Sequence, residues 1–296
     1  MTASHAAEIA AARIVEPGVS SSSTPDLGNL TLLISHDRSG SHYLGSYIRA
    51  LANCRMIDEV CNEDALDPAA NPLSFFGFRH RRAQDDPDFE LRRRPQTVSR
   101  LLDEYFGFVL QTSSPKAPIV DIKYGHVHNF EIAWWPIFRK PFLFEYARSR
   151  RIRIVHLFRW NSLETVVSGY VAESRKQWHA IGDKQPAEAS DAIVVNLANF
   201  ADQIAMLNSQ KAAFGKWMQG IPALNLTYEE LVDGEAGTEA RARVAQFLKS
   251  PVPAEFTSPY RKVTPEAHLI VQNWTQLQDY CRENGLAHYL VPQRRL

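Results

Sequence analysis

A short apolar segment that runs directly into a polar, glycine-containing loop restricts the possible folds of this chain. Leu30–Ile34 (LTLLI) carries no charge, which is typical of a strand buried on both faces of a sheet. The loop Ser35–Ser41 (SHDRSGS) follows, and apolar residues then recur at helical spacing from Tyr43 to Leu51. The order of strand, tight polar loop and helix predicts the first unit of an α/β fold.

The rest of the chain repeats this alternation. Buried-strand patterns occur at residues 119–123, 152–158 and 223–227. Helical patterns occur at residues 163–179, 193–217, 244–248 and 274–280. Strands that alternate with helices predict a P-loop-like, three-layer α/β fold, in which helices flank a mostly parallel central sheet. Residues 62–95 have no clear period, so we expect an irregular excursion over the sheet edge, where substrate-contacting loops often lie.

Length and composition set the domain organisation. A Pro-, Gly- and Ser-rich tract at residues 16–29 predicts a flexible leader over residues 1–29. Residues 30–296 are long enough to form a single domain with a buried core. No stretch approaches the roughly 20 apolar residues of a membrane span, and the N-terminus is a poor signal peptide. Three scattered cysteines indicate a reducing compartment, so we expect a cytoplasmic protein without a transmembrane segment.

The charge balance excludes one class of partner. The chain has 33 Lys and Arg residues against 33 Asp and Glu residues, a formal net charge of zero. A general nucleic-acid binder usually carries a strongly basic surface, so nucleic acid is not the expected ligand. No residue spacing indicates a metal site either.

The loop after the first strand has the chemistry of an anion site. Ser39, Gly40 and Ser41 lead into a helix, whose first backbone N–H groups are free to bind an anion. Gly40 permits close approach of the backbone, and Arg38 adds a full positive charge. The loop therefore predicts a bound phosphate or sulfate. The alternative is that Ser39-Gly40-Ser41 merely caps the helix.

The loop differs from that of ATP-binding P-loop proteins. No glycine stands five residues before Gly40, and His42 occupies the place where the Walker pattern would continue with Lys and Ser or Thr. Asp121 is a weak candidate for organising Mg²⁺. An ATP-using phosphotransferase is therefore disfavoured, although it stays open as an alternative.

A second anion site is predicted at the end of the third predicted strand. Arg159 comes directly after residues 152–158, and Ser168 lies near the second turn of the following helix. Both belong to the carboxyl edge of the sheet, beside the first loop, where α/β proteins bind ligands. Together they predict a site for a second phosphate group of the ligand, a group that ATP does not carry at the corresponding position.

With these two sites, the sequence resembles sulfotransferases that use 3′-phosphoadenosine 5′-phosphosulfate (PAPS). The resemblance is to the bacterial carbohydrate branch, and most of all to the rhizobial nodulation-factor (lipochitooligosaccharide) sulfotransferases. Arg38-Ser-Gly-Ser-His-Tyr-Leu44 is similar to their R-[ST]-G-[ST]-H-Y-L loop, and Arg159-Trp-Asn-Ser-Leu-Glu164 with Ser168 is similar to their R-R-N-x-L-E…S segment.

Two later stretches continue the resemblance. Leu226–Leu231 with residues 244–248 is similar to the family's Y-E-x-L…L-x-F-L stretch. Arg261-Lys262 and Asn273-Trp274 resemble its C-terminal basic pair and N-[FW]-x-x-L helix. The likeness covers roughly residues 30–278 and is strongest in the two anion-site segments.

The resemblance implies that the protein transfers the sulfuryl group from PAPS to a hydroxyl of a carbohydrate or glycolipid acceptor. It implies a PAPS site made of Arg38, Ser39, Gly40, Ser41, His42 and Tyr43 at the 5′-phosphosulfate, and of Arg159, Ser168, Arg261 and Lys262 at the 3′-phosphate. Arg38 would stabilise the leaving phosphate, and Lys123, on the family's lysine-bearing strand, would neutralise the sulfuryl oxygens.

The general base has two candidates. Glu59 is the first, because it matches a glutamate at the same place in the rhizobial enzymes; its alternative role is a salt bridge or a solvated carboxylate. His126, at the mouth of the strand at residues 119–123, is the second. A loop histidine is more often an ordinary surface residue, and His128 competes with it.

Two departures from the family pattern keep another function open. Trp160 stands where the family often has arginine. Gly45 and Ser46 stand where several carbohydrate sulfotransferases carry a glutamate on the first helix. The alternative is therefore a non-catalytic relative that binds PAPS or its product, 3′-phosphoadenosine 5′-phosphate (PAP).

Overall fold

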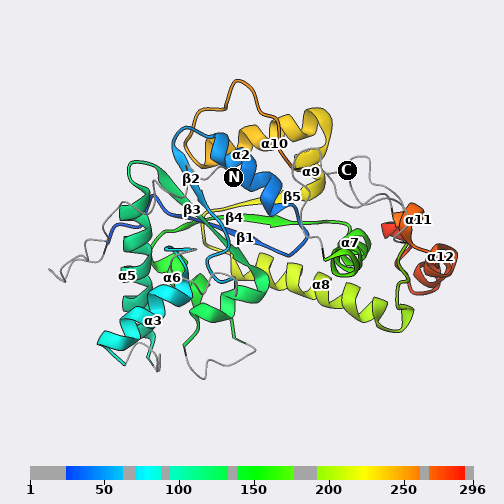
Figure 1. The fold of residues 1–296 in the computed structure, drawn as a ribbon, viewed down its shortest axis with the longest axis horizontal. Coiled ribbons are helices and arrows are strands. Elements are labelled where there is room, and N and C mark those ends of the chain that lie inside the picture. Colours follow the sequence, from blue (N-terminus) through cyan, green and yellow to red (C-terminus); the bar gives the residue numbers. More distant parts are fainter. Residues whose placement is uncertain are drawn as a thin grey trace.

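Five parallel strands form the centre of the molecule. The computed structural model describes residues 25–62, 71–87, 94–132, 139–176, 192–260 and 267–290 (Figure 1). The strands are β1 (Thr31–Ser35), β2 (Cys54–Ile57), β3 (Ala117–Lys123), β4 (Arg153–Phe158) and β5 (Ala223–Thr227). Their order in the sheet is β2-β3-β1-β4-β5, and every pairing is parallel. The predicted parallel sheet is therefore confirmed.

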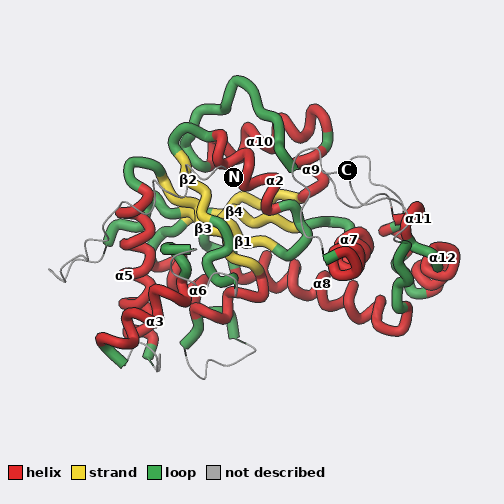
Figure 2. The backbone as a smooth tube through the Cα atoms, viewed as in Figure 1, coloured by secondary structure: helices red, strands yellow, loops and turns green. Residues whose placement is uncertain are grey.

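Helices cover both faces of this sheet (Figure 2). The helices are α2 (Ser41–Ala50), α3 (Phe75–Asp85), α5 (Pro95–Ser113), α6 (Phe142–Ser149), α7 (Ser162–Arg175), α8 (Leu197–Trp217), α9 (Tyr228–Val232), α10 (Gly234–Phe247), α11 (Ala267–Ile270) and α12 (Trp274–Glu283). Two 3-10 helices, η2 (Tyr124–Phe130) and η3 (Ala287–Tyr289), complete the described elements. The three-layer α/β architecture agrees with the sequence prediction.

The core has one cluster on each face of the sheet, because successive side chains of a strand point to opposite faces. Leu33 of β1 packs in a cluster with Leu44 of α2 and Val244 of α10. Its neighbour Leu32 belongs to a separate cluster with Phe106 of α5 and Phe214 of α8. All five residues of β1 are buried, as expected for the central strand of a covered parallel sheet.

A third cluster joins α7 and α8 to the C-terminal helices. Val167, Phe200 and Leu277 are buried in it. A parallel bridge pairs Ile193, which precedes α8, with Val271, which directly follows α11. In Figure 1, α11 and α12 accordingly lie beside α7, at one end of the molecule. This packing holds the C-terminal segment against the helix that follows β4.

Two of the predicted helix limits are wrong. The helix predicted at residues 193–217 begins at Leu197, because the side chain of Asn196 accepts a hydrogen bond from the amide of Ala198 (3.0 Å) and caps it. The helix predicted to reach residue 179 ends at Arg175, since Lys176 adopts a left-handed conformation (φ 49°).

The segment at residues 62–95 also differs from the irregular loop that we predicted. Its described part contains the regular helix α3, which starts where the Ser74 side chain accepts a hydrogen bond from the amide of Gly77 (3.2 Å). Phe75 is buried in the core, whereas Arg81 on the same helix is exposed. A single buried ring in an arginine-rich stretch produces too weak a period to reveal a helix.

Two further findings concern the beginning of the chain. The edge strand β2 was not predicted, because it has only four residues and Arg55 interrupts its apolar pattern. Residues 1–24 of the predicted leader lie outside the described residues. Leu27, which follows them, is buried in the core and accepts a backbone hydrogen bond from Leu30 (2.9 Å).

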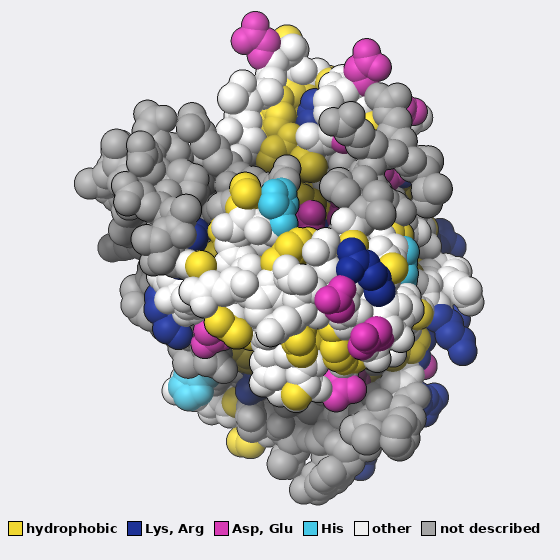
Figure 3. All heavy atoms as spheres, turned by 90° about the vertical axis from the view of Figure 1, so that its right-hand side faces the viewer, with side chains coloured by type: hydrophobic (Ala, Val, Ile, Leu, Met, Phe, Trp, Pro, Cys, Tyr) yellow, Lys and Arg dark blue, Asp and Glu magenta, His cyan; other side chains and the backbone are white. Residues whose placement is uncertain are grey.

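The surface of the described residues shows no segregation of charge on the side that carries α12. Lys and Arg side chains alternate there with Asp and Glu side chains (Figure 3), in keeping with the zero net charge. Within the ranges that the structure describes, no helix combines the length and the apolar character that a membrane crossing requires.

The central strand should dominate the stability of the fold. Replacing the fully buried Leu33 by alanine removes contacts in the core and should lower the free energy of unfolding by about 2–5 kcal/mol. Leu269→Ala is the matched control, because Leu269 is 63% exposed and its loss should change the free energy by no more than about 0.5 kcal/mol. Urea unfolding of both variants measures this, and equal losses would contradict the assignment of β1 to the core.

Candidate functional site

The candidate site lies where the chain leaves β1 and β4. These two strands are neighbours, but the connection from β1 leads to β2 on one side of the sheet and that from β4 leads to β5 on the other. Such a reversal opens a crevice at the carboxyl ends of the strands, where α/β proteins bind ligands. The loops at residues 36–40 and 159–161 border this point.

The loop after β1 has an unusual backbone. Arg38 and Gly40 both adopt left-handed conformations, with φ values of 62° and 86°. A Cβ atom at Gly40 would lie 2.4 Å from Cδ2 of Tyr228, so a side chain does not fit there. A non-glycine residue in the left-handed region, as at Arg38, is uncommon and is frequent at binding sites.

The two serines of the loop do not cap α2. Ser39 is buried and its hydroxyl donates to the carbonyl of His36 (2.5 Å), while the hydroxyl of Ser41 accepts a hydrogen bond from Lys123. No side chain of the described residues caps the helix at Gly40. Gly40 is the N-cap residue of α2, but neither serine side chain caps the helix, so its N-terminal end keeps its capacity for an anion.

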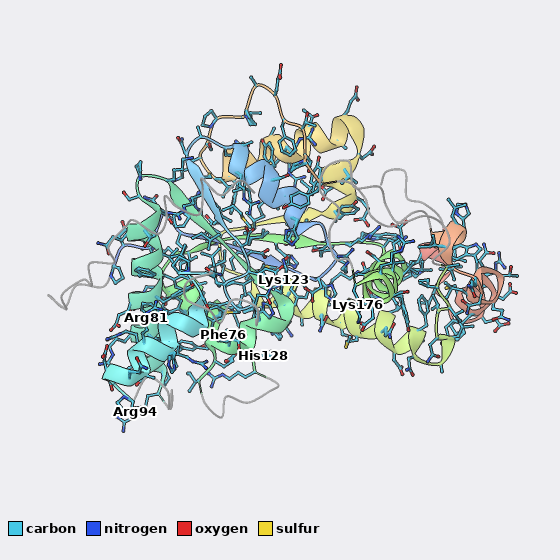
Figure 4. All side chains as sticks on the ribbon, viewed as in Figure 1. Phe76, Arg81, Arg94, Lys123, His128 and Lys176 are labelled. Atoms are coloured by element: carbon cyan, nitrogen blue, oxygen red, sulfur yellow. The ribbon has the colours of Figure 1, made fainter. Side chains whose placement is uncertain are left out.

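Lys123, labelled in Figure 4, ends β3 and contacts Ser41, the first residue of this helix. Its ammonium group donates to Oγ of Ser41 (2.7 Å) and Oγ of Ser35 (3.3 Å), and it pairs with Oδ2 of Asp121 (2.7 Å). Burial by itself lowers the pKa of Lys123, but the charges of Asp121 and Glu59 outweigh it, so the pKa is raised. A fixed positive charge therefore stands beside the first residue of α2.

Glu59 faces the same ammonium group from the segment after β2. Its Oε1 lies 3.3 Å from Nζ of Lys123 and 3.7 Å from Nε2 of His42. The nearby imidazole of His42 and the ammonium group of Lys123 lower the pKa of Glu59 to about 2, although burial opposes them. Glu59 is therefore ionised at neutral pH and takes part in an ion pair.

The structure brings Arg38, which the resemblance assigned to the 5′-phosphosulfate, to Ser168 of the predicted second anion site. Nε of Arg38 donates to Oγ of Ser168 (3.2 Å), although the two residues lie 130 positions apart. Burial lowers the pKa of Arg38, and the neighbouring charge of Arg159 lowers it further. Arg159 is buried, its guanidinium contacts the carboxylate of Glu164, and it lies 4.8 Å from the ring centre of Tyr228.

Tyr228, in the stretch similar to Y-E-x-L, is a site residue to which the sequence analysis gave no role. The same ring packs on Gly40 of the first loop and on Arg159 of the second, so it joins the two predicted anion sites. Its signal in the sequence is its position directly after β5, at the carboxyl edge of the sheet. That position becomes informative only when β5 is known to lie next to β4.

The remaining predicted residues lie elsewhere or outside the described ranges. The hydroxyl of Tyr43 accepts a hydrogen bond from Arg241 of α10 (3.1 Å), and its ring packs on Phe256, so it faces α10. His126 is half-buried on η2, and within the described chain no hydrogen bond or ion pair joins it to Glu59 or Lys123. The competing residue His128 is exposed on the same turn (Figure 4). Arg261 and Lys262 lie outside the described residues.

The departure at Trp160 has a packing explanation. Its ring lies 5.5 Å from that of Tyr289 and 6.2 Å from that of His288. A large aromatic side chain at this position therefore holds the C-terminal residues against the loop that carries Arg159.

The arrangement offers two positions for negative groups, one at Ser41 and Lys123 and one at Arg38, Arg159 and Ser168. No protein-family model matches the sequence, and no curated protein is similar to it. The geometry of these two positions is therefore the basis for the functional argument.

The backbone of the first loop should not tolerate a side chain at Gly40. Gly40→Ala should lower the free energy of unfolding by about 1–3 kcal/mol, because alanine is strained at φ 86° and its Cβ meets Tyr228. Gly169→Ala on α7 is the matched control, since a Cβ there meets nothing within 4 Å and alanine favours a helix by up to about 1 kcal/mol. Urea unfolding distinguishes them, and an unaffected Gly40→Ala variant would refute the close contact with Tyr228.

The ion pair of Glu59 predicts a pH dependence of stability. The folded-state pKa is about 2 and the ordinary value is 4.5, so the stabilisation by Glu59 is present above pH 4.5 and is lost as the pH falls toward 2. At pH 7, Glu59→Gln should therefore be less stable than the parent by about 1–3 kcal/mol.

Urea unfolding at pH 7 and pH 3 measures this difference, which should shrink at the lower pH. Glu239→Gln, at an exposed position of α10, should change the free energy little at either pH. A Glu59→Gln deficit that is the same at both pH values would show that the carboxylate is not held in its charged form.

Proposed function

We propose that this protein is a PAPS-dependent sulfotransferase that transfers a sulfuryl group to a hydroxyl of a carbohydrate or glycolipid acceptor. The observation that carries the proposal is the meeting of Arg38, Arg159 and Ser168 beside the loop at the N-terminus of α2. A single strand–loop–helix accommodates one phosphate group. A second cluster of cationic side chains next to it supports a ligand with a second phosphate, such as the 3′-phosphate of PAPS.

The residues of the first position suit the 5′-phosphosulfate. When bound, PAPS supplies the sulfuryl group and its 5′-phosphate is the leaving group. The uncapped amides of α2 would stabilise the negative charge that develops on the leaving phosphate as the bond from sulfur to the bridging phosphate oxygen breaks. Lys123 already donates to three acceptors, among them Ser41, so it would contribute its charge and not a direct contact. This role uses the fixed charge of Lys123, which Asp121 and Glu59 keep protonated.

Glu59 is the favoured proton acceptor because it lies beside Lys123. The acceptor hydroxyl loses its proton as its oxygen forms the new bond to sulfur, and the Glu59 carboxylate is ionised and positioned to take that proton. A pKa of about 2 makes it a weak base, so its contribution comes mainly from position and charge. His126 has no described contact with this group and is the weaker candidate.

The position of Glu59 also bears on the alternative that the protein is a non-catalytic relative that binds PAPS or PAP. Gly45 and Ser46 leave α2 without the glutamate that several carbohydrate sulfotransferases carry, and Oγ of Ser46 is hydrogen-bonded to the carbonyl of Tyr43 (2.7 Å). Glu59 nevertheless provides a carboxylate 3.3 Å from Lys123. A carboxylate so close to the first anion position favours the catalytic form of the proposal.

Binding of matched nucleotides tests the proposal. PAPS and adenosine 5′-phosphosulfate differ only in the 3′-phosphate, so calorimetry without an acceptor should show tighter binding of PAPS by at least about tenfold. Arg159→Ala should weaken PAPS binding by about 30-fold or more and change binding of adenosine 5′-phosphosulfate little. Arg282→Ala, at an exposed position of α12, is the matched control and should change neither.

Two results would contradict the proposal. Equal affinity for the two sulfated nucleotides would remove the second phosphate position. Preference for Mg·ATP over PAPS would instead favour the P-loop phosphotransferase. Where PAPS is preferred, transfer of labelled sulfate to carbohydrate acceptors, and its loss in Glu59→Gln, separates the enzyme from a binding protein.

A further inference from the structure

The loop that carries Arg159 is held from both faces of the sheet by two residues that do not belong to it. Lys211 lies on α8, which packs on one face of the sheet through Phe214. Glu229 lies on α9, which packs on the opposite face through Leu231. Figure 1 shows these two helices on opposite sides of the sheet, with the end of β4 between them.

Lys211 binds the carbonyl side of the loop. Its ammonium group donates to the carbonyl oxygens of Arg159 (3.0 Å) and Trp160 (3.2 Å) and to Oγ of Ser162 (2.6 Å). An ammonium group has three donors, and these three acceptors use all of them. Burial lowers the pKa of Lys211 to about 8.

Glu229 binds the amide side of the same loop. Its Oε2 accepts a hydrogen bond from the amide of Trp160 (2.9 Å), and its Oε1 accepts one from the amide of Asn161 (3.1 Å). Oε1 also lies 3.9 Å from Nε of Arg159. The carboxylate therefore contacts both the backbone of the loop and the guanidinium that the loop presents.

Together these contacts hold two successive peptide groups at both ends. The peptide group between Arg159 and Trp160 has its carbonyl on Lys211 and its amide on Glu229, and the next peptide group is held in the same way. These two planes flank Trp160 and fix its backbone, and the first of them is also the peptide plane that follows Arg159. On its other side Arg159 follows Phe158, which pairs with Thr227 in the sheet, so rotation of the Arg159 backbone would break a charge-assisted hydrogen bond or disturb the strand pairing. The direction in which the Arg159 side chain leaves the backbone is thereby set, and Glu164, Glu229 and the Tyr228 ring contact its guanidinium.

We propose that Lys211 and Glu229 are positioning residues that aim Arg159 at the 3′-phosphate and so determine selectivity for 3′-phosphorylated nucleotides. This inference rests on the proposed function. Neither residue is assigned to bind the nucleotide, because the donors of Lys211 and the oxygens of Glu229 are already used within the loop. The amides of Trp160 and Asn161 donate to Glu229 and are not free for the phosphate. The phosphate is therefore bound there by the side chains of Arg159, Arg38 and Ser168.

The test compares PAPS with adenosine 5′-phosphosulfate in the 296-residue chain. Lys211→Met keeps the length of the side chain but removes its donors, and it should weaken PAPS binding by about five- to thirtyfold. Binding of adenosine 5′-phosphosulfate should change by less than about twofold, because that ligand has no group for Arg159. Lys216→Met, at an exposed position of the same helix, is the matched control and should leave both affinities unchanged.

Glu229→Gln tests the other side of the loop. Glutamine has one acceptor oxygen where Glu229 has two, so one amide loses its partner, and we expect the same selective loss of PAPS affinity. Glu239→Gln, an exposed position on α10, should have no effect. Lys211→Arg keeps the charge and several donors and should restore part of the selectivity that Lys211→Met loses. Circular dichroism of each variant reports whether the fold is intact.

The possible outcomes separate this inference from the proposed function. If the parent does not prefer PAPS, both are wrong. If the parent prefers PAPS and Lys211→Met and Glu229→Gln keep that preference, only the positioning role is wrong. An equal loss of both nucleotides in a folded variant would show a general structural role and would also overturn the inference.

Discussion

Parallel pairing of β1 between β3 and β4 is the constraint on which the site depends. A strand in this position has both edges hydrogen-bonded and both faces covered, so its residues are buried and its polar groups can emerge only at its ends. Because all five strands run the same way, the loops that follow them meet at one edge of the sheet. Arg38, Lys123 and Arg159 come from three different strand ends and reach this edge for that reason.

The two anion positions are built in different ways. Lys123 is almost fully buried, and carboxylates on β3 and after β2 compensate its charge, so it acts as a fixed part of the scaffold. Arg38 and Arg159 are close enough to affect each other, and hydroxyl, carboxylate and aromatic groups surround them. A charge supported by the scaffold suits a reacting group, whereas a pair of neighbouring guanidinium groups suits recognition of a phosphate that does not react.

Local patterns predicted the strands and the loops well. The uncharged segment at residues 30–34 and its glycine-containing loop predicted the central strand and the helix after it, because burial on two faces excludes charge. The same reasoning found Arg159 and Ser168 but missed β2 and α3. β2 has only four residues and α3 is rich in arginine, so neither shows a clear apolar period. Tyr228, Lys211 and Glu229 were missed because their partners are distant in the sequence.

The sequence by itself determined the alternation of strands and helices, the parallel sheet and the residue types at each strand end. These features follow from the local periodicity of apolar residues and from backbone requirements such as glycine at position 40. Only the tertiary structure decided which strand ends are neighbours and which distant side chains complete the site. Glu59 reaches Lys123 through the edge strand β2. Lys211 and Glu229 reach one loop from opposite faces of the sheet, an encounter set by the packing of α8 and α9 and therefore absent from any local pattern.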